Sequence, residues 1–77
     1  MADNTTIDLR GLKCPGPIVQ LNEEIANVEA GSEVVAMADD KAFELDVQAW
    51  CRRTGHELVS FEILDNTLTA CIRKQSN

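Results

Sequence analysis

Residues 11–17 read Gly-Leu-Lys-Cys-Pro-Gly-Pro and stand between a short alternating segment and a longer stretch with helical periodicity. Proline is well suited to the first position of a helix, because the N–H that it lacks would have no partner inside the helix. We therefore predict that a strand is broken at Gly11 and that a helix begins at Pro15, with Cys14 as its N-cap. Pro17 falls in the same turn, where it stiffens the start of the helix at little cost in hydrogen bonds.

The segments that flank this stretch predict the first half of the fold. Residues 6–9 alternate as a short strand, with Ile7 and Leu9 facing inward. From residue 15 to about residue 28 the apolar side chains repeat at helical spacing, and Gly31 ends the segment. The apolar positions of this helix are Ile18, Leu21, Ile25 and Val28.

A second strand and a second helix follow. Residues 33–38 predict a strand, which ends at the pair Asp39 and Asp40. Either carboxylate can cap a helix over about residues 42–54, and Gly55 is suited to its C-cap. Helix capping also explains the acidic pair more simply than a catalytic carboxylate dyad does. The apolar stripe of this predicted helix consists of Phe43, Val47, Trp50, Cys51 and Thr54.

The last third of the chain predicts a hairpin. Residues 58–64 and 67–73 alternate, and Asp65-Asn66 forms a two-residue turn of residues that tolerate positive φ. The element order βαβαββ then predicts an α+β two-layer sandwich, with two helices on one face of a mixed four-stranded sheet. We place Val59, Phe61 and Ile63 on one face of the first hairpin strand, and we expect Leu68, Ala70 and Ile72 to face inward from the second.

The length and composition fit one small domain. The chain has 77 residues, of which 44% are hydrophobic, and this is enough for a globular fold. We expect a single domain over residues 1–77, with an ordered core of about residues 6–74. No segment approaches the ~20 apolar residues of a membrane span. Residues 1–6 lack the basic and apolar regions of a secretion signal, so we expect a cytoplasmic protein.

The formal net charge of −6 restricts the kinds of partner. It opposes sequence-independent binding to nucleic acid, which needs Lys and Arg to displace counterions. It also opposes docking on an anionic membrane. We therefore expect no direct contact with nucleic acid or membrane, whereas a protein partner with a basic patch is compatible with this charge.

Cys14 is the main candidate for chemistry. Its predicted place at a helix N-terminus favours the thiolate, because the pKa of a cysteine falls there. Arg10 and Lys13 lie close in the sequence and could steady an anion or steer a partner. Pro15 and Pro17 would hold the sulfur in one place. The alternative, a buried cysteine that only fills space, fits an exposed strand-to-helix loop less well.

The other candidate groups have simpler explanations. Cys51 lies on the apolar stripe of its helix, which favours core packing. Cys71 alternates out of the core set of the last strand and is expected to face the open side of the sheet or a partner. His56 is expected to close a turn, because a role as general base for Cys14 requires two distant loops to meet. There is no Cys-x-x-Cys pair and no local metal-ligand spacing, so we expect free thiols and no metal.

With these motifs in place, the chain resembles the TusA/SirA/YedF family of small sulfur-relay proteins over most of its length, from Ile7 to Lys74. The most specific match is the pattern Gly-Leu-x-Cys-Pro-x-Pro at residues 11–17. Proline often follows the aspartate pair in this family, where the present chain has Lys41. Further matching pieces follow in the expected order: Leu9-Arg10, Gly31, Asp39-Asp40, Asp46, Trp50-Cys51, Thr54-Gly55-His56-Glu57 and Ile72-Arg73-Lys74.

The resemblance implies the same sandwich fold and a sulfurtransferase that acts as a stoichiometric carrier. Cys14 would accept a sulfane sulfur as a persulfide and hand it to another protein. Donors in the family are cysteine desulfurases or rhodanese-like proteins, and acceptors include DsrE-type proteins. Family members serve tRNA thiolation, molybdenum cofactor synthesis or sulfur oxidation. No metal or organic cofactor is implied.

Three rival hypotheses make different predictions. A thiol-based redox sensor would form a sulfenic acid at Cys14 or a disulfide with Cys51 or Cys71. A non-catalytic protein-binding regulator would bind through the open face of the sheet and would keep full function in Cys14→Ser. RNA binding, which occurs in similar small sandwiches, is opposed by the net charge.

Overall fold

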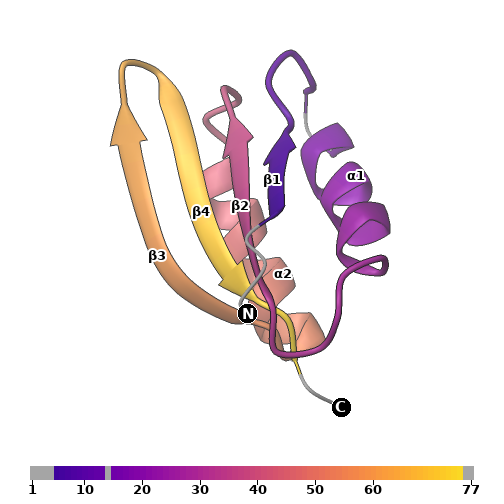
Figure 1. Ribbon diagram of the computed structural model, residues 1–77. Helices are drawn as coiled ribbons and strands as arrows, with labels where there is room; N and C mark the ends of the chain where they lie inside the picture. Colours follow the sequence, from indigo (N-terminus) through magenta and orange to yellow (C-terminus); the bar gives the residue numbers. More distant parts are fainter. Residues whose placement is uncertain (1–4, 14, 76–77) are drawn as a thin grey trace.

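The computed structural model describes residues 5–13 and 15–75. Its elements follow the predicted order βαβαββ (Figure 1). The strands are β1 (Thr5–Asp8), β2 (Glu33–Ala38), β3 (Glu57–Leu64) and β4 (Thr67–Arg73), and the helices are α1 (Gly16–Ile25) and α2 (Phe43–Thr54).

The four strands form one mixed sheet in the order β1-β2-β4-β3. β1 runs parallel to β2, whereas β4 is antiparallel to both of its neighbours, β2 and β3. Both helices cover one face of this sheet (Figure 1), so the α+β two-layer sandwich is confirmed. Because β1 and β2 are parallel and adjacent, they end at the same edge of the sheet. That edge carries the two loops that lead into the helices.

The core lies between the helices and the sheet. α1 buries Leu21 and Ile25, as its periodicity predicts. The predicted stripe of α2 is buried except for Thr54, which is half-buried. Apolar burial of this extent is the main favourable term in folding a domain of this size. The largest fully buried side chains are Trp50, Phe43, Leu9, Leu21, Ile72, Val34, Val47 and Pro17.

α1 begins one residue later than predicted. The helix starts at Gly16, and Pro15 takes the N-cap position with φ −93° and ψ 14°. Pro17, at the second helical position, is fully buried, so its ring packs in the core as well as stiffening the turn. The helix ends at Ile25, earlier than the periodicity predicts. The predicted N-cap, Cys14, lies outside the described residues.

One strand departs from the predicted alternation. A β-bulge interrupts the pairing of β3 with β4 between Leu58 and Ser60, so Val59 is the extra residue. The prediction that Val59 shares a face with Phe61 is therefore wrong. Leu58, which pairs with the buried Ile72, packs against the core in its place, and Val59 is 40% exposed.

The turns after α2 and within the hairpin confirm the predicted turn chemistry. Gly55 adopts the left-handed conformation with φ 87°, and its amide donates to the carbonyl of Cys51 near the end of α2. Asp65 and Asn66 have positive φ values of 50° and 66°. Positive φ at both central residues is the geometry of a type I′ turn, which matches the twist of the flanking strands.

The acidic pair after β2 differs from the prediction. Asp40 Oδ1 accepts the amide of Ala42 at 3.0 Å in the turn that leads into α2, whereas the N-cap position itself is Ala42. Asp39 instead reaches the loop after β1, where it accepts the amide of Gly11. The prediction that one of these carboxylates caps α2 is therefore wrong, because Asp40 closes a local turn before the helix and Asp39 bonds a residue in another loop.

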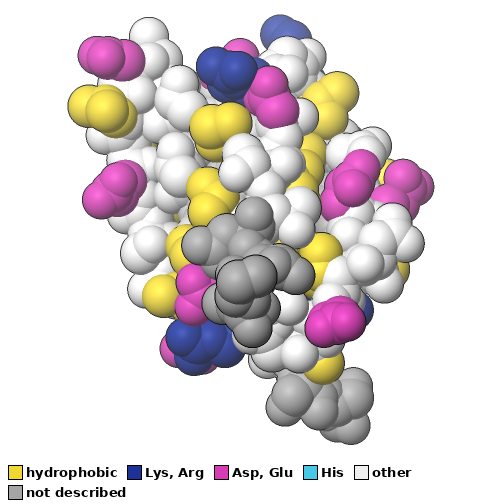
Figure 2. All heavy atoms as spheres, in the orientation of Figure 1, with side chains coloured by type: hydrophobic (Ala, Val, Ile, Leu, Met, Phe, Trp, Pro, Cys, Tyr) yellow, Lys and Arg dark blue, Asp and Glu magenta, His cyan; other side chains and the backbone are white. Residues whose placement is uncertain are grey.

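Neither helix covers the opposite face of the sheet, which we call its open face. Figure 2 looks onto this side, and its described residues place hydrophobic side chains among charged and uncharged ones. Val35, Met37 and Cys71 are half-buried on this face, which confirms the predicted outward placement of Cys71. Within residues 5–13 and 15–75, neither helix has the length and apolar character needed to cross a membrane.

Candidate functional site

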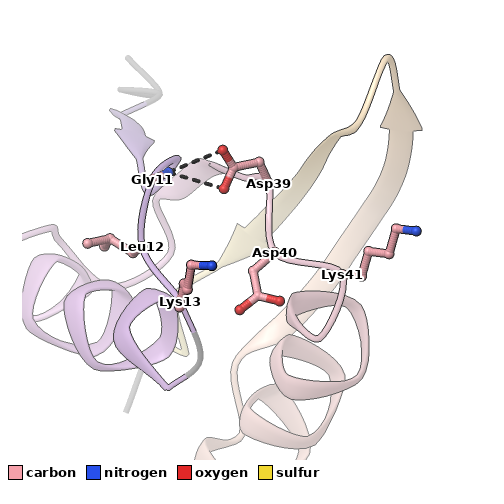
Figure 3. A pocket seen from close by; sticks show the side chains of 6 residues that line it. All are labelled: Gly11, Leu12, Lys13, Asp39, Asp40 and Lys41. Carbon is pink, nitrogen blue, oxygen red and sulfur yellow. Dashed lines mark hydrogen bonds between the residues drawn. The ribbon is translucent and has the colours of Figure 1, made fainter.

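The loop after β1 and the loop after β2 face each other at the edge where these parallel strands end (Figure 3). A surface pocket of about 500 Å³ lies between them. Residues 11–13 of the predicted site motif form one wall of this pocket, so the structure brings these three residues and the acidic pair together. The pocket is lined by Gly11, Leu12, Lys13, Asp39, Asp40 and Lys41.

The loop after β1 contains a tight turn. The amide of Leu12 donates to the carbonyl of Leu9 at 3.3 Å, and Gly11 at the third position of the turn has φ 90°. A positive φ at this position is typical of a type II turn and favours glycine. A Cβ on Gly11 would have no atom within 4 Å. Glycine is therefore favoured at position 11 by the backbone conformation and not by a lack of space for a side chain.

Arg10 is held by the carboxylate of Asp8 at the end of β1. Its Nε and Nη2 donate to the two oxygens of Asp8 at 2.8 and 3.0 Å, and its amide donates to Asp8 Oδ1 at 3.1 Å. The guanidinium bonds, followed by the amide bond, lower the pKa of the Asp8 carboxyl to about 2. Because both side chains are about half exposed, the pair orients Arg10 more than it stabilises the fold. Asp8 also balances the positive charge of Arg10, which we predicted would steady an anion.

Lys13 is the basic residue that faces the pocket. Its side chain is exposed and points toward the loop of Asp39 and Asp40, whereas Lys41 points away toward the hairpin (Figure 3). Lys13 directly precedes Cys14 in the chain. Of the two basic residues named in the sequence prediction, Lys13 is therefore the better candidate for a charge interaction in this pocket.

The first turn of α1 offers fewer amide donors than its sequence position suggests. Pro15 and Pro17 have no N–H, and the amide of Gly16 donates to the carbonyl of Lys13 at 2.7 Å. No acidic residue lies in this turn, so nothing there opposes the positive end of the helix dipole. An anion beside this turn would thus be stabilised by the dipole and by Lys13, and not by free amides of residues 15–17.

His56 lies at the opposite edge of the sheet from the pocket. It directly precedes Glu57, which pairs with Arg73 at the end of β4. Its Nδ1 accepts the amide of Gln75 at 2.9 Å, so the ring closes a turn as predicted. The structure does not bring His56 near residues 11–13, and it offers no general base from this residue to that loop.

Cys51 and Cys71 are poor nucleophiles. Cys51 is 5% exposed, which confirms core packing, and burial raises the pKa of its thiol to about 11. Cys71 Sγ lies 3.6 Å from Glu33 Oε1, and burial followed by this carboxylate raises the pKa of Cys71. Both thiols therefore stay protonated near neutral pH, where the thiolate is the reactive form.

The contact between Asp39 and Gly11 was missed by sequence reasoning. The two residues lie 28 positions apart, so no local pattern joins them. One signal was present, because each residue follows one of two strands that the βαβ order makes parallel, and such strands end at the same edge of a sheet.

In the part of the chain that the structure describes, no cluster of three or more His, Cys, Asp or Glu could hold a metal ion.

Residues 5–74 match the family model described as Sulfurtransferase TusA. The sulfur carrier protein TusA of Pseudomonas syringae is 32% identical over 79 aligned positions, which cover 97% of this chain and 94% of that protein. A candidate sulfur carrier protein of Neisseria meningitidis serogroup A is 32% identical over 71 residues, covering 92% of this chain and 96% of that protein.

A longer relative matches through one part of its length only. A candidate sulfur carrier protein of Aquifex aeolicus is 34% identical over 74 residues, which cover 96% of this chain and 38% of that protein. The family match spans all six elements and includes the cysteine motif at residues 11–17. On this match, and on relatives aligned over nearly the whole chain, the protein belongs to the TusA sulfurtransferase family.

Proposed function

We propose that this protein is a sulfur carrier that accepts a sulfane sulfur as a persulfide on Cys14 and passes it to an acceptor protein. The observation that carries the proposal is the family match together with the motif that contains Cys14. Relatives named as sulfur carriers support it. Lys13 and Pro15, the chain neighbours of Cys14, are both exposed, as access by a partner requires.

Loading and delivery are two thiol exchanges of the same kind. The Cys14 thiolate attacks the outer sulfur of the donor's persulfide, so a new S–S bond forms while the donor's S–S bond breaks and the donor leaves as a thiolate. The acceptor's thiolate then attacks the outer sulfur on Cys14, and Cys14 leaves as a thiolate. The sulfane sulfur changes partner without net oxidation or reduction, so neither step requires a cofactor.

The residues around Cys14 would support these steps unequally. The amine of Lys13 is directed into the pocket and would steady a thiolate or persulfide anion. Pro15 and the buried Pro17 would hold the start of α1 rigid. Arg10, which is bound to Asp8, would contribute to the shape of the loop more than to its charge.

Protein partners follow from a carrier role. A cysteine desulfurase or a rhodanese-like protein would donate the sulfur, and a DsrE-type protein would accept it. The net charge of −6 and the carboxylate of Asp40 at the pocket fit partners that carry basic residues around their reactive cysteine, because complementary charge steers association. The relay would serve tRNA thiolation, molybdenum cofactor synthesis or sulfur oxidation.

Intact-mass spectrometry tests the carrier function. The reduced protein is incubated with a cysteine desulfurase plus cysteine, or with a rhodanese plus thiosulfate. We expect a gain of one sulfur atom that reductant removes and that Cys14→Ser abolishes. Cys71→Ser is the matched control, because Cys71 lies on the open face of the sheet, and this variant should load like the wild type.

Three results would argue against the proposal. Absence of loading from both donors would contradict the carrier function. Loading that persists in Cys14→Ser would contradict the assignment of the residue. A disulfide between Cys14 and Cys51 or Cys71 under oxidant, in a protein that does not load, would favour the redox sensor instead.

A further inference from the structure

Asp39 makes a contact that the chemistry of sulfur exchange does not itself require. Both of its carboxylate oxygens accept the amide of Gly11, at 3.1 and 3.3 Å (Figure 3). The contact joins the loop after β1 to the loop after β2 on the wall of the pocket that Lys13 also lines. Asp39 further borders a second pocket of about 580 Å³ beside the hairpin.

The hydrogen bonds of the turn explain why Gly11 needs an acceptor from elsewhere. The amide of Leu12 closes the turn, and the amide of Arg10 donates to Asp8. A type II turn uses only the amide of its fourth residue internally, so the Gly11 amide points to a partner outside the turn. Asp39 supplies that partner from a loop 28 positions away in the chain.

This contact restrains the chain on one side of position 14. On the other side, Pro17 is fully buried, and the amide of Gly16 donates to the carbonyl of Lys13 at 2.7 Å. A reactive group on a restrained segment stays close to one geometry, and a displacement of about 1 Å can cost on the order of 100-fold in rate. We infer that Asp39 is a positioning residue for sulfur transfer, acting through the Gly11 amide. This inference rests on the carrier function proposed for Cys14.

Two substitutions separate the hydrogen bond from the charge. Asp39→Ala removes the acceptor, whereas Asp39→Asn keeps one oxygen acceptor and removes the charge. Because the contact is exposed, both variants should remain folded, which circular dichroism checks. Glu44→Ala is the matched control, because it removes the same charge from the first turn of α2 beside the second pocket.

The first measurement is the single-turnover rate of sulfur loading from a rhodanese persulfide, at saturating rhodanese. We expect Asp39→Ala to load about 10-fold or more slowly than the wild type, with the half-saturating rhodanese concentration unchanged. Asp39→Asn should stay within about threefold of the wild type. Glu44→Ala should load at the wild-type rate.

The second measurement is hydrogen exchange at the Gly11 amide, which reads the contact without any sulfur transfer. In Asp39→Ala this amide should exchange about three- to tenfold faster, as expected for the loss of one net hydrogen bond. Asp39→Asn and Glu44→Ala should leave the exchange rate of Gly11 close to that of the wild type.

Each contrary result points to a different error. Unchanged loading or unchanged Gly11 exchange in Asp39→Ala would overturn the inference and leave the carrier function standing. A loss in Asp39→Asn as large as in Asp39→Ala would assign Asp39 a charge role instead. A raised half-saturating concentration with an unchanged rate at saturation would assign it a docking role. If the wild type does not load at all, the carrier function fails, and the transfer role of Asp39 fails with it.

Discussion

The sheet has two edges at which its strands begin and end, and different contacts hold each of them. At one edge, which we name the pocket end (residues 9–13 and 39–41), side-chain carboxylates tie exposed loops beside an open pocket. At the other, the anchor end (residues 28–33, 55–57 and 73–75), backbone groups, half-buried side chains and the ion pairs of Arg73 with Glu33 and Glu57 tie the last strand to its neighbours. This difference indicates that one set of contacts shapes the candidate site and a separate set closes the fold by joining the last strand to its neighbours.

Lys74 is the centre of the anchor end. Its Nζ donates to the carbonyl of Val28 at 2.7 Å, and its amide donates to the carbonyl of Ser32 at 2.8 Å. Its own carbonyl accepts the amide of Gly31 at 3.0 Å. Three bonds from one residue link the end of β4 to the connection between α1 and β2. Changes at this end should therefore lower stability, whereas changes at the pocket end should alter reactivity first.

The largest effect is expected from removing the aromatic ring of α2 that packs at the anchor end. Trp50 is 2% exposed, its ring lies 5.1 Å from that of His56, and its Nε1 donates to Asn22 Oδ1 of α1 at 3.3 Å. Trp50→Ala should lower the free energy of unfolding by about 3–5 kcal/mol, because it leaves a cavity. Urea denaturation followed by circular dichroism measures this loss.

The matched control for this change lies on the same helix. Leu45 is 73% exposed, so Leu45→Ala should change the free energy of unfolding by less than about 0.5 kcal/mol. Similar losses in the two variants would show that burial of Trp50 is not what holds the helix layer to the sheet.

Two glycines, one at each end, offer the sharpest comparison. Gly11 and Gly55 have φ values of 90° and 87°, so alanine at either position should cost about 1–2 kcal/mol of stability through backbone strain. Gly11→Ala should also slow sulfur loading, because it distorts the turn that Asp39 holds. Gly55→Ala should load at the wild-type rate. The free energy of unfolding and the single-turnover loading rate, measured on both variants, check this difference.

Crowding distinguishes the two positions and provides a control. A Cβ on Gly55 would lie 2.5 Å from Oε1 of Gln75, the far end of a flexible side chain, whereas a Cβ on Gly11 would have nothing within 4 Å. Adding Gln75→Ala to Gly55→Ala should therefore recover only a small part of the lost stability, namely the part that comes from this contact. Equal loss of loading in both alanine variants would mean that the two ends are not independent.

Sequence periodicity predicted most of the fold and only part of the site. The alternation over residues 33–38 predicted β2 with its observed bounds, because nothing interrupts that strand. The bulge at Val59 was missed, since one extra residue arises from pairing with β4 and leaves no local mark. The bond from Gly11 to Asp39 was missed for the same reason: capping is a local rule, and the acceptor of this amide depends on two loops that meet only in the folded chain.

The smallest effect is expected from the titration of His56, the one histidine in the chain. Burial, followed by the charge of Lys74, lowers the pKa of His56 below its usual value of 6.5. Its Nδ1 accepts the amide of Gln75 at 2.9 Å, and a protonated nitrogen cannot accept this bond. Because the unfolded chain binds the proton more readily, this contribution is fully present above pH 6.5 and is lost as the pH falls toward the lower folded-state pKa.

The urea midpoint should therefore fall slightly between about pH 7.5 and pH 5.5, a range in which histidine is the side chain that ordinarily titrates. His56→Gln, which retains an oxygen acceptor and does not titrate, should flatten this dependence. The Gln75 amide of the wild type should exchange faster at the lower pH than the intrinsic rate predicts, whereas protection of the Gly11 amide should not follow the same titration. If both amides lost protection together, the pocket end would be coupled to the anchor end, and the separation between shaping the site and closing the fold would not hold.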